Sequence, residues 1–439
     1  MLNSLLSTLE VAEGLFWEYG GVPTLILVGI YFTFISRGFQ LIKFPAIMKS
    51  FYHTMRETST DSRGVRPLYV FFTSIGGCVG IGNVVAVCTA VQIGGPGAVF
   101  WMWVAGFFGM LVKYAEIYLG MIYRVQDEKN SYVGGPIIYL QKISGGKWLS
   151  KIVAFLLCIY GLEVYMFGVI TDTVVTGWNV YPSIAITGLI ALIILVGEGG
   201  VNLVGKVSSI LLPVFLTLFI GMSFFVFAVN IHLFPAMLYL IFSSAFTSHA
   251  AVGAFTGCSV MMAMSHGIRR ACYTGDLGIG YASTIHSQTS ETDPSREALM
   301  GIVAIFLDTF VICTLSLFLI LLTDTWHSGV DETLMVATAL GKYFPFVDIL
   351  WPIFIFLLGF TSLTSFYVVG KNSAAFLFGS IGNKIYPFVA IALFLAFSCI
   401  GTMFHAMMLM SITGALLLMF NLYGIIRLSD KIQFNLKGK

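Results

Sequence analysis

Long apolar runs, separated by short polar connections, make up most of the chain. A helix that crosses a bilayer needs about 20 predominantly apolar residues. Two short segments, 265–296 and 324–345, have room for interfacial helices between such runs. The pattern predicts an all-α polytopic membrane protein of about eleven spans, which lie at 15–36, 68–93, 97–121, 151–176, 180–198, 205–230, 236–264, 297–323, 346–370, 385–402 and 403–424.

Lysine and arginine fall almost entirely on one side of these spans. That side holds the connections after spans one and three, the pair Arg269 and Arg270, and the basic tail 425–439. The opposite side holds only Lys342, and Lys113 lies inside a span. Because cytoplasmic loops of membrane proteins are enriched in Lys and Arg, we expect the N-terminus outside and the C-terminus in the cytoplasm. We expect the protein in the inner (plasma) membrane.

Composition agrees with this class of protein. Hydrophobic residues make up 58% of the 439 residues and charged residues only 10%, whereas a soluble domain has about 25% charged residues. A net charge of +2 gives no indication of a nucleic-acid partner. The seven cysteines form no C-x-x-C pair, so neither a disulfide framework nor a zinc site is predicted. The first apolar run has no basic segment before it, so we expect no cleavable signal peptide.

The second span contains an unusual run of glycines. Gly76, Gly77, Gly80 and Gly82 lie within seven residues, and each glycine costs a helix interior about 1 kcal/mol relative to alanine. The run therefore predicts a broken helix. Bare peptide groups are tolerated in a membrane only where they line a cavity or meet a ligand, and broken helices carry the binding sites of many secondary transporters. The alternative is that the glycines only permit close helix packing.

The spans divide into two groups of five after an extra N-terminal helix at 15–36. The first group covers 68–230 and the second 236–424, and an odd number of helices per group gives them inverted topology. The second group should then open with its own broken helix. Residues 241–258 fit, because Ser and Thr interrupt this apolar run and Gly253 and Gly257 follow at i, i+4 spacing.

Several motifs resemble the alanine/glycine:cation symporter family over nearly the whole chain. They are VGIGN at 79–83, GGPGAVFWMW at 94–103, GGP at 134–136, IFSSAFT at 241–247 and LDTFVICT at 307–314. VGIGN is also similar to the broken first helix of neurotransmitter:sodium symporters, whose core fold this family is thought to share. The resemblance implies sodium-coupled uptake of alanine, glycine or a similar small amino acid by alternating access, with Na+ as the coupling ion and no other cofactor.

The resemblance also implies positions for the two ligands. Main-chain groups of Val79, Gly80 and Gly82 would meet the substrate carboxylate and the ion, and Asn83 would offer an oxygen to sodium. Ile81, Phe246 and Thr247 would wall the substrate pocket. Hydroxyls of Thr361, Thr364 and Ser365, on one helical face at i, i+3 and i+4, would complete the sodium site.

Some polar positions of the family differ in this chain. Ile81 replaces the threonine of V-G-T-G-N, and Phe167 or Gly168 stands near the place of a glutamine in span four. Ser248-His249 replaces Pro-Gln, and the family's S-N-E-A-G is here Thr274-Gly275-Asp276-Leu277-Gly278. These departures allow a substrate other than alanine or glycine.

Each candidate also has a structural interpretation. Asn83 could cap the second half-helix, since Asn is a favoured N-cap residue, and the three hydroxyls could bond their own helix backbone. Glu163, a carboxylate inside span four, is a candidate for proton coupling or a neutral acid bonded to a helix neighbour. Lys113 and Glu116 at i, i+3 predict an ion pair within span three.

Other functional classes fit the sequence less well. A channel would need a continuous ring of pore-lining groups, and a membrane enzyme would need a catalytic motif such as HExxH or G-x-S-x-G, which the chain lacks. GDLGIG at 275–280 lacks the Lys-Ser/Thr of a phosphate-binding loop. A proton-coupled carrier of the same fold is the main alternative, and oligomeric state is not predicted.

Overall fold

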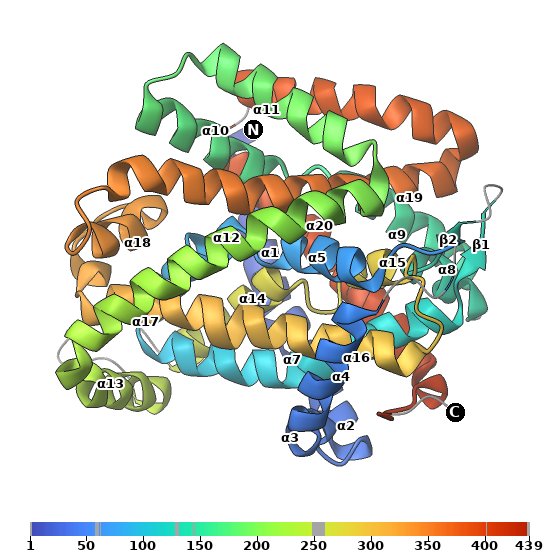
Figure 1. Ribbon diagram of the computed structural model, residues 1–439, viewed down its shortest axis with the longest axis horizontal. Coiled ribbons are helices and arrows are strands. Elements are labelled where there is room, and N and C mark those ends of the chain that lie inside the picture. Colours follow the sequence, from blue (N-terminus) through green and yellow to red (C-terminus); the bar gives the residue numbers. More distant parts are fainter. Residues whose placement is uncertain are drawn as a thin grey trace.

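A computed structural model describes residues 2–57, 61, 63–127, 131–143, 145–247, 260–400 and 402–436. Almost all of the chain is helical, as predicted, and the helices form one bundle (Figure 1). Its only strands within the described part are the short antiparallel pair β1 (Val125–Gln126) and β2 (Tyr132–Val133).

The first half of the chain runs from α1 to α12. Its helices are α1 (Leu2–Phe16), α2 (Val22–Ile35), α3 (Phe39–Ile42), α4 (Phe44–Arg56), α5 (Pro67–Cys78), α6 (Ala86–Gly94), α7 (Gly97–Ile122), α8 (Pro136–Tyr139), α9 (Gly146–Tyr160), α10 (Val164–Trp178), α11 (Pro182–Gly197) and α12 (Gly200–Val229). The second half holds α13 (Phe234–Phe246), α14 (Val260–Gly275), α15 (Tyr281–His286), α16 (Pro294–Ile305), α17 (Thr314–Leu322), α18 (Glu332–Gly341), α19 (Val347–Ile400) and α20 (Met403–Arg427).

Within the described residues, seven helices are long and apolar enough to cross a membrane, or eight if the bent pair α5–α6 is one span. The long α19 turns at Gly379, which has a φ of 61°, so it contains two of the predicted spans. The expected number of eleven is approximate. Most boundaries agree with the prediction within a few residues, because length and hydrophobicity set them.

The predicted seventh span, 236–264, is described only in part: α13 ends at Phe246, and residues 248–259 lie outside the described residues. The helix α13 begins beside Phe227 near the end of α12, with ring centroids of Phe227 and Phe234 5.0 Å apart. It ends beside Gly97 at the start of α7, where a methyl group on Gly97 would lie 2.4 Å from the carbonyl oxygen of Ser244. Since α12 ends and α7 starts at the same end of the bundle (left in Figure 1), α13 lies across that end.

The next helices, α14 and α15, pack against α7, although most of this segment was expected to be interfacial. Both pack inside the bundle, and every residue of α15 is buried. The expected break at 241–258 lies mostly outside the described residues, Ser248, His249, Gly253 and Gly257 included. What is described of it is that α13 ends at Phe246 and that Thr247 is extended.

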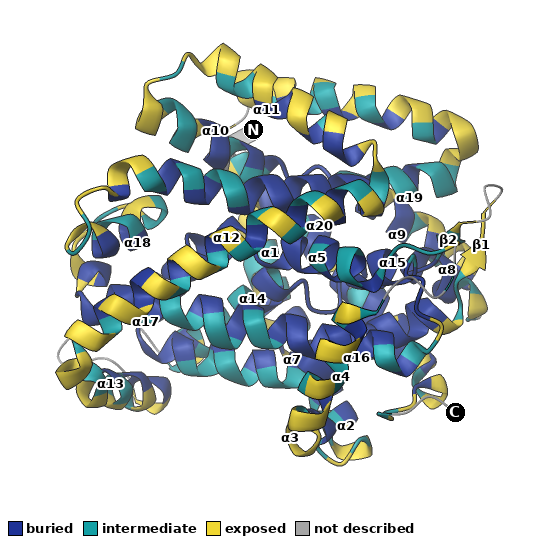
Figure 2. Cartoon of the chain, in the orientation of Figure 1, coloured by how far each residue is buried: buried dark blue, intermediate teal, exposed yellow. Residues whose placement is uncertain are grey.

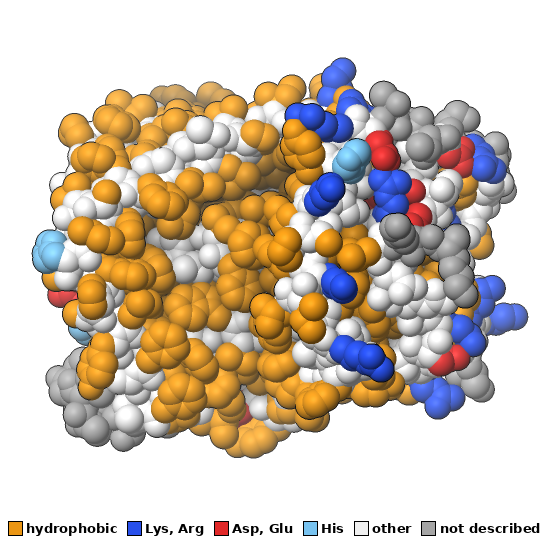
Figure 3. Space-filling view, turned by 60° about the horizontal axis from the view of Figure 1, so that its bottom comes forward, with side chains coloured by type: hydrophobic (Ala, Val, Ile, Leu, Met, Phe, Trp, Pro, Cys, Tyr) orange, Lys and Arg blue, Asp and Glu red, His pale blue; other side chains and the backbone are white. Residues whose placement is uncertain are grey.

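Burial is greatest along the middle of the bundle, around α5, α7, α15 and α16, whereas α11, α12 and α13 expose one face (Figure 2). The exposed side chains of these outer helices are largely apolar, such as Leu195, Ile210 and Tyr239. Figure 3 shows an apolar surface over much of the molecule and lysine and arginine gathered toward one end. This surface is that of a multi-pass membrane protein.

Candidate functional site

The predicted break in the second span is confirmed. Helix α5 ends at Cys78, a single helical turn covers Ile81–Asn83, and α6 continues at an angle of 53° to α5. Gly80, in the break, has extended backbone with φ −126° and ψ −163°. A Cβ at Gly80 would lie 2.5 Å from the Ser362 hydroxyl, so only glycine lets α5 and α19 approach this closely.

Asn83 fixes the shape of this break. Its Oδ1 accepts a hydrogen bond from the Gly80 N–H at 2.9 Å, and its Nδ2 donates to Asp308 Oδ1 at 2.6 Å. The Cys313 sulfur also lies 3.2 Å from Nδ2. Both ends of the amide are therefore occupied, but Asn83 is not the N-cap of α6 that the sequence analysis considered, because Val85 holds that position without a side-chain hydrogen bond. The Gly80 N–H is occupied as well, so the expectation that it binds the substrate carboxylate does not fit this conformation.

A second break separates α14 from α15, at the sequence GDLGIG. Asp276, Gly278 and Gly280 all have positive φ values, of 46°, 71° and 97°. The glycines adopt this conformation easily, whereas for Asp276 it is uncommon. The two glycines thus serve a helix break and not a phosphate loop.

Two charged side chains of α7 hold the ends of this second break. The Lys113 ammonium donates to the carbonyl oxygens of Gly275 at 2.8 Å and Asp276 at 3.3 Å, at the C-terminus of α14. Glu116 Oε1 accepts the Ser283 N–H at 3.1 Å, in the first turn of α15. Each charge therefore meets the helix end of opposite partial charge. The predicted ion pair between Lys113 and Glu116 is wrong, because these helix ends bind both side chains.

The two breaks face a common cavity of about 380 Å³. Gly77, Cys78 and Gly82 line it from the first break, and Thr274 and Asp276 from the second. Cys78 and Gly275 join the two breaks directly, through a contact of 3.6 Å between Sγ and the carbonyl oxygen. The other lining residues are Glu10, Glu13, Gly14, Ala86, Ile93, Tyr160, Glu163, Tyr165, Met166, His266, Arg269, Arg270, Tyr273, Phe366, Phe404, Met407, Met408, Met410 and Ser411.

Of the predicted substrate residues, only Gly82 lines this cavity. Ile81 is fully buried and points at α19, where a methyl group on Gly359 would lie 2.7 Å from its Cδ1. Phe167 stacks on Phe394 at 4.5 Å and lines a second cavity of about 200 Å³. The expectation that these two side chains shape the substrate pocket does not fit the structure.

The prediction placed Phe246 and Thr247 in the wall of the substrate pocket, but neither residue lines the cavity. Phe246 is 59% exposed and packs on Phe100, with ring centroids 5.0 Å apart, while Thr247 is exposed and bonds the Ser243 carbonyl. Both belong to the end of α13, which lies across the end of the bundle. Their family motif therefore marks a packing surface against α7 in this conformation.

Two of the five predicted sodium ligands, Thr361 and Ser365, lie close together. Thr361 and Ser365 of α19 face Gly76 of α5, and a methyl group on Gly76 would lie 3.4 Å from Ser365 Oγ and 3.5 Å from Thr361 Cβ. Ser208 of α12, which the sequence analysis missed, lies 3.3 Å from the same point. The hydroxyls of Ser208 and Ser365 are buried without a hydrogen-bond partner in the described residues. Val79, which directly follows α5, and Thr364 of α19 are also buried.

Hydroxyls of α19 also serve the structural roles considered above. Thr361 donates to the Leu358 carbonyl at 2.9 Å and Thr364 to the Phe360 carbonyl at 2.8 Å. Ser362 donates to the Gly76 carbonyl at 2.8 Å. A hydroxyl that donates to its own helix keeps its lone pairs, so these bonds leave Thr361 and Thr364 able to bind a cation.

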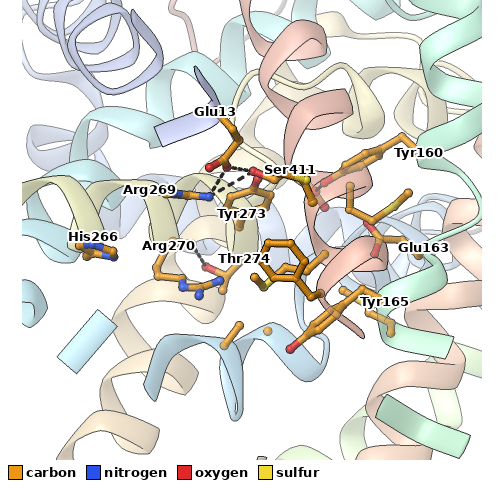
Figure 4. Close-up of a pocket in the computed structure, with 18 of the residues that line it drawn as sticks. Glu13, Tyr160, Glu163, Tyr165, His266, Arg269, Arg270, Tyr273, Thr274 and Ser411 are labelled. Carbon is orange, nitrogen blue, oxygen red and sulfur yellow. Dashed lines mark hydrogen bonds and ion pairs between the residues drawn. The ribbon is translucent and has the colours of Figure 1, made fainter. Parts of the chain in front are cut away.

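Glu163 lies in the cavity wall between α9 and α10 (Figure 4). It is 5% exposed and has a φ of 44°, which a non-glycine residue adopts rarely. Nearby, the Tyr160 hydroxyl donates to Asp276 Oδ1 at 3.2 Å. The second oxygen of Asp276 is buried without a partner in the described part of the chain.

The sequence analysis assigned Arg269 and Arg270 to the cytoplasmic group of basic side chains, and the structure corrects this assignment. Both lie on α14 and line the cavity. Arg269 forms an ion pair with Glu13 of α1, and the Ser411 hydroxyl of α20 is hydrogen-bonded to both side chains. The hydrophobicity of α14 is low because of these residues, which is why an apolar-length criterion missed it. In the sequence, the available signal for this helix break was the pair Gly278 and Gly280, two residues apart in GDLGIG.

A family model described as "Sodium:alanine symporter family" matches residues 2–438. The chain is 31% identical over 415 residues to an uncharacterized transporter, YflA, of Bacillus subtilis (strain 168), covering 89% of this chain and 84% of that protein. It is 27% identical over 436 residues to the sodium/alanine symporter AgcS of Methanococcus maripaludis, covering 94% of each. It is 28% identical to the probable sodium/glutamine symporter GlnT of B. subtilis, covering 97% and 89%.

Among solved structures, MhsT in complex with L-phenylalanine superposes with a TM-score of 0.58 and 16% identity, over 85% of this chain and 90% of that chain. A manganese transporter of Eremococcus coleocola superposes with a TM-score of 0.52 and 14% identity, over 82% and 79%. At such low identity these two structures show the fold alone, that of a transporter core with broken helices.

Proposed function

The chain belongs to the sodium:alanine symporter family, and on this premise we propose that it carries a small neutral amino acid, of the alanine or glycine class, into the cell by alternating access. It is a sodium-coupled amino-acid transporter and not an enzyme. The observation that supports the proposal best is the cavity between the two breaks. There, helix ends and main-chain groups meet a space large enough for a ligand.

Sodium would bind beside Gly76, between α5, α12 and α19. The carbonyl oxygens of the α5 terminus, Val79 included, and the hydroxyls of Thr361, Thr364 and Ser365 are hard oxygen ligands of the kind that alkali and alkaline-earth cations prefer. The buried Ser208 and Ser365 hydroxyls without partners support this, since such groups in a folded protein call for a water or an ion.

Uptake into proteoliposomes tests the sodium site. Thr364→Val and Ser365→Ala should each raise the sodium concentration for half-maximal uptake by about tenfold, the equivalent of about 1.4 kcal/mol of lost binding. Ser373→Ala is the matched control, because this buried hydroxyl on the same helix bonds only the Val369 carbonyl in the described structure. An unchanged sodium requirement in both test variants would place the ion elsewhere.

Proton coupling is the second candidate, and the position of Glu163 in the cavity wall favours it. If Glu163 carries the coupling proton, Glu163→Gln should abolish uptake driven by a pH gradient and leave uptake driven by a sodium gradient intact. If sodium is the sole coupling ion, a pH gradient alone drives no uptake even in the unmodified protein.

The N-terminus would face outside and the C-terminus the cytoplasm. The gathering of lysine and arginine at one end of the molecule supports this orientation, even after Arg269 and Arg270 are removed from the count (Figure 3). Single cysteines at Lys147 and Lys342, in a cysteine-free background, would test it. A membrane-impermeant thiol reagent added to whole cells should label only the second.

A further inference from the structure

Two adjacent arginines of α14 have very different surroundings. Arg269 is satisfied by Glu13 and Ser411. Arg270 makes one hydrogen bond in the described structure, from Nη2 to the Thr89 hydroxyl of α6, and no ion pair. Because a guanidinium has five N–H donors, Arg270 keeps several for the cavity that it lines.

Negative charge lies on the other side of the same cavity. Figure 4 shows Arg270 and Glu163 on opposite sides of the pocket, both among its lining residues. Asp276 lines it too, with one carboxylate oxygen bound by Tyr160 and the other buried without a partner in the described part. Glu163 and Asp276 both have left-handed backbone conformations, and strained backbone of this kind gathers at functional sites.

The cavity also has more room than alanine requires. A protein cavity of about 150 Å³ accommodates benzene, which has six heavy atoms like alanine. The present cavity, at about 380 Å³, is more than twice as large. Its walls between the charged groups are aromatic or apolar, for example Tyr165, Tyr273 and Phe366.

We propose that Arg270 binds a carboxylate of the transported amino acid, while Glu163 and Asp276 face its ammonium group, so that the cavity accepts amino acids longer than alanine. This inference rests on the proposed amino-acid transport. A planar guanidinium matches the two oxygens of a carboxylate in a bidentate geometry, which a lysine ammonium does not. The carboxylate is either the α-carboxylate or one at the end of the side chain, and the volume gives room for both.

The test is ligand binding to purified, detergent-solubilised protein at saturating sodium, measured as thermal stabilisation by alanine and by glutamate. Arg270→Gln should weaken binding by about 10- to 100-fold, as expected for the loss of hydrogen bonds to a charged group. Arg270→Lys, which keeps the charge but not the planar fork, should fall between this variant and the unmodified protein. Lys342→Gln removes a positive charge outside the cavity, where Lys342 bonds the Thr323 carbonyl, and serves as the control.

The pattern of loss distinguishes the two carboxylates. Equal weakening of alanine and glutamate places the α-carboxylate on Arg270, and weakening of glutamate alone places the side chain there. Either result supports the proposal. Binding of both ligands within twofold of the unmodified protein by Arg270→Gln overturns it.

Two further measurements keep these outcomes separate from other failures. If Arg270→Gln does not fold, Thr89→Val replaces it, because losing the hydroxyl that positions the guanidinium should still weaken binding several-fold, and unchanged binding would count against the proposal. If the unmodified protein shows sodium-dependent uptake of no amino acid, the proposed transport function fails first, independently of Arg270.

Discussion

Two hydrogen bonds link Gly80 through Asn83 to Asp308, and we expect this bridge to hold the first break in shape. Its contribution to the free energy of unfolding can be predicted. All three residues are fully or almost fully buried, and the two bonds of the bridge measure 2.9 and 2.6 Å. Asn83→Ala removes both bonds, leaving the Gly80 N–H and the Asp308 carboxylate without their partner. Asn83→Asp keeps an acceptor for Gly80 but places two carboxyl groups against each other.

The expected cost follows from the groups left behind. An unsatisfied buried main-chain N–H costs about 1–3 kcal/mol, and a hydrogen bond to a charged group contributes about 1.5–3 kcal/mol. We therefore expect Asn83→Ala to lower the free energy of unfolding by about 3–5 kcal/mol and N83D by about 2–4 kcal/mol. The exchange N83D/D308N restores a donor and an acceptor across the same gap, so it should recover most of the loss.

Equilibrium unfolding in mixed micelles, with increasing sodium dodecyl sulfate, measures these differences. The double-mutant cycle for N83D, D308N and their combination should give a coupling energy of at least about 1.5 kcal/mol, well above the 0.3–0.5 kcal/mol within which independent sites add. Additive effects of the two substitutions would refute the bridge as the support of the break. Ser316→Ala, a buried hydroxyl change on α17 that touches neither residue of the pair, is the control.

Substitutions of Gly77 and Gly80 test the close packing around the first break. Gly77→Ala places a methyl group 2.1 Å from the Tyr281 hydroxyl oxygen and 2.3 Å from the ring carbon that bears it, so it should lower the free energy of unfolding by about 1–3 kcal/mol in the same assay, as overpacking does. Gly80→Ala should abolish uptake while membrane insertion persists, because its methyl group meets Ser362 Oγ at 2.5 Å; Ser362→Ala should restore uptake in part, and normal uptake by the single variant would show that this contact does not matter.

The first break was predictable from the sequence because it is encoded locally. Four glycines in seven apolar residues lower helix stability whatever surrounds them, and the residues VGIGN agree with a known family. The packing consequences were not predictable. The Asn83 side chain is hydrogen-bonded to Asp308, which is 225 residues away in the sequence, and no local sequence pattern connects these two residues.

The second break was missed because its signals are weaker and its helix is polar. Gly278 and Gly280 are separated by Ile279 in an apolar setting, and Arg269 and Arg270 lower the hydrophobicity of α14. Counting apolar residues therefore assigned a core helix to the surface. The expected inverted repeat led to a second break at 241–258, which lies mostly outside the described residues, whereas the break at 275–280 was not predicted.

The error over Lys113 and Glu116 shows a general limit of spacing arguments. Residues at i, i+3 on a helix can pair, but the pair contributes only about 0.2–0.5 kcal/mol on a helix surface. In the membrane interior, the bare carbonyls and N–H groups of a broken helix are costly without partners. Lys113 and Glu116 therefore bind the two ends of the α14–α15 break, one turn apart on α7, in preference to each other.

This difference in support suggests how the two breaks behave during transport. The first break is held by Asn83 of its own segment, which accepts from the Gly80 N–H three residues earlier and donates to Asp308. The second is held from outside, by two charges on α7. Movement of α14 or α15 relative to α7 must break a charge-assisted bond in the membrane interior, and movement of the first break relative to Asp308 must break the bond from Asn83. We therefore expect α7, α14 and α15 to move as one body.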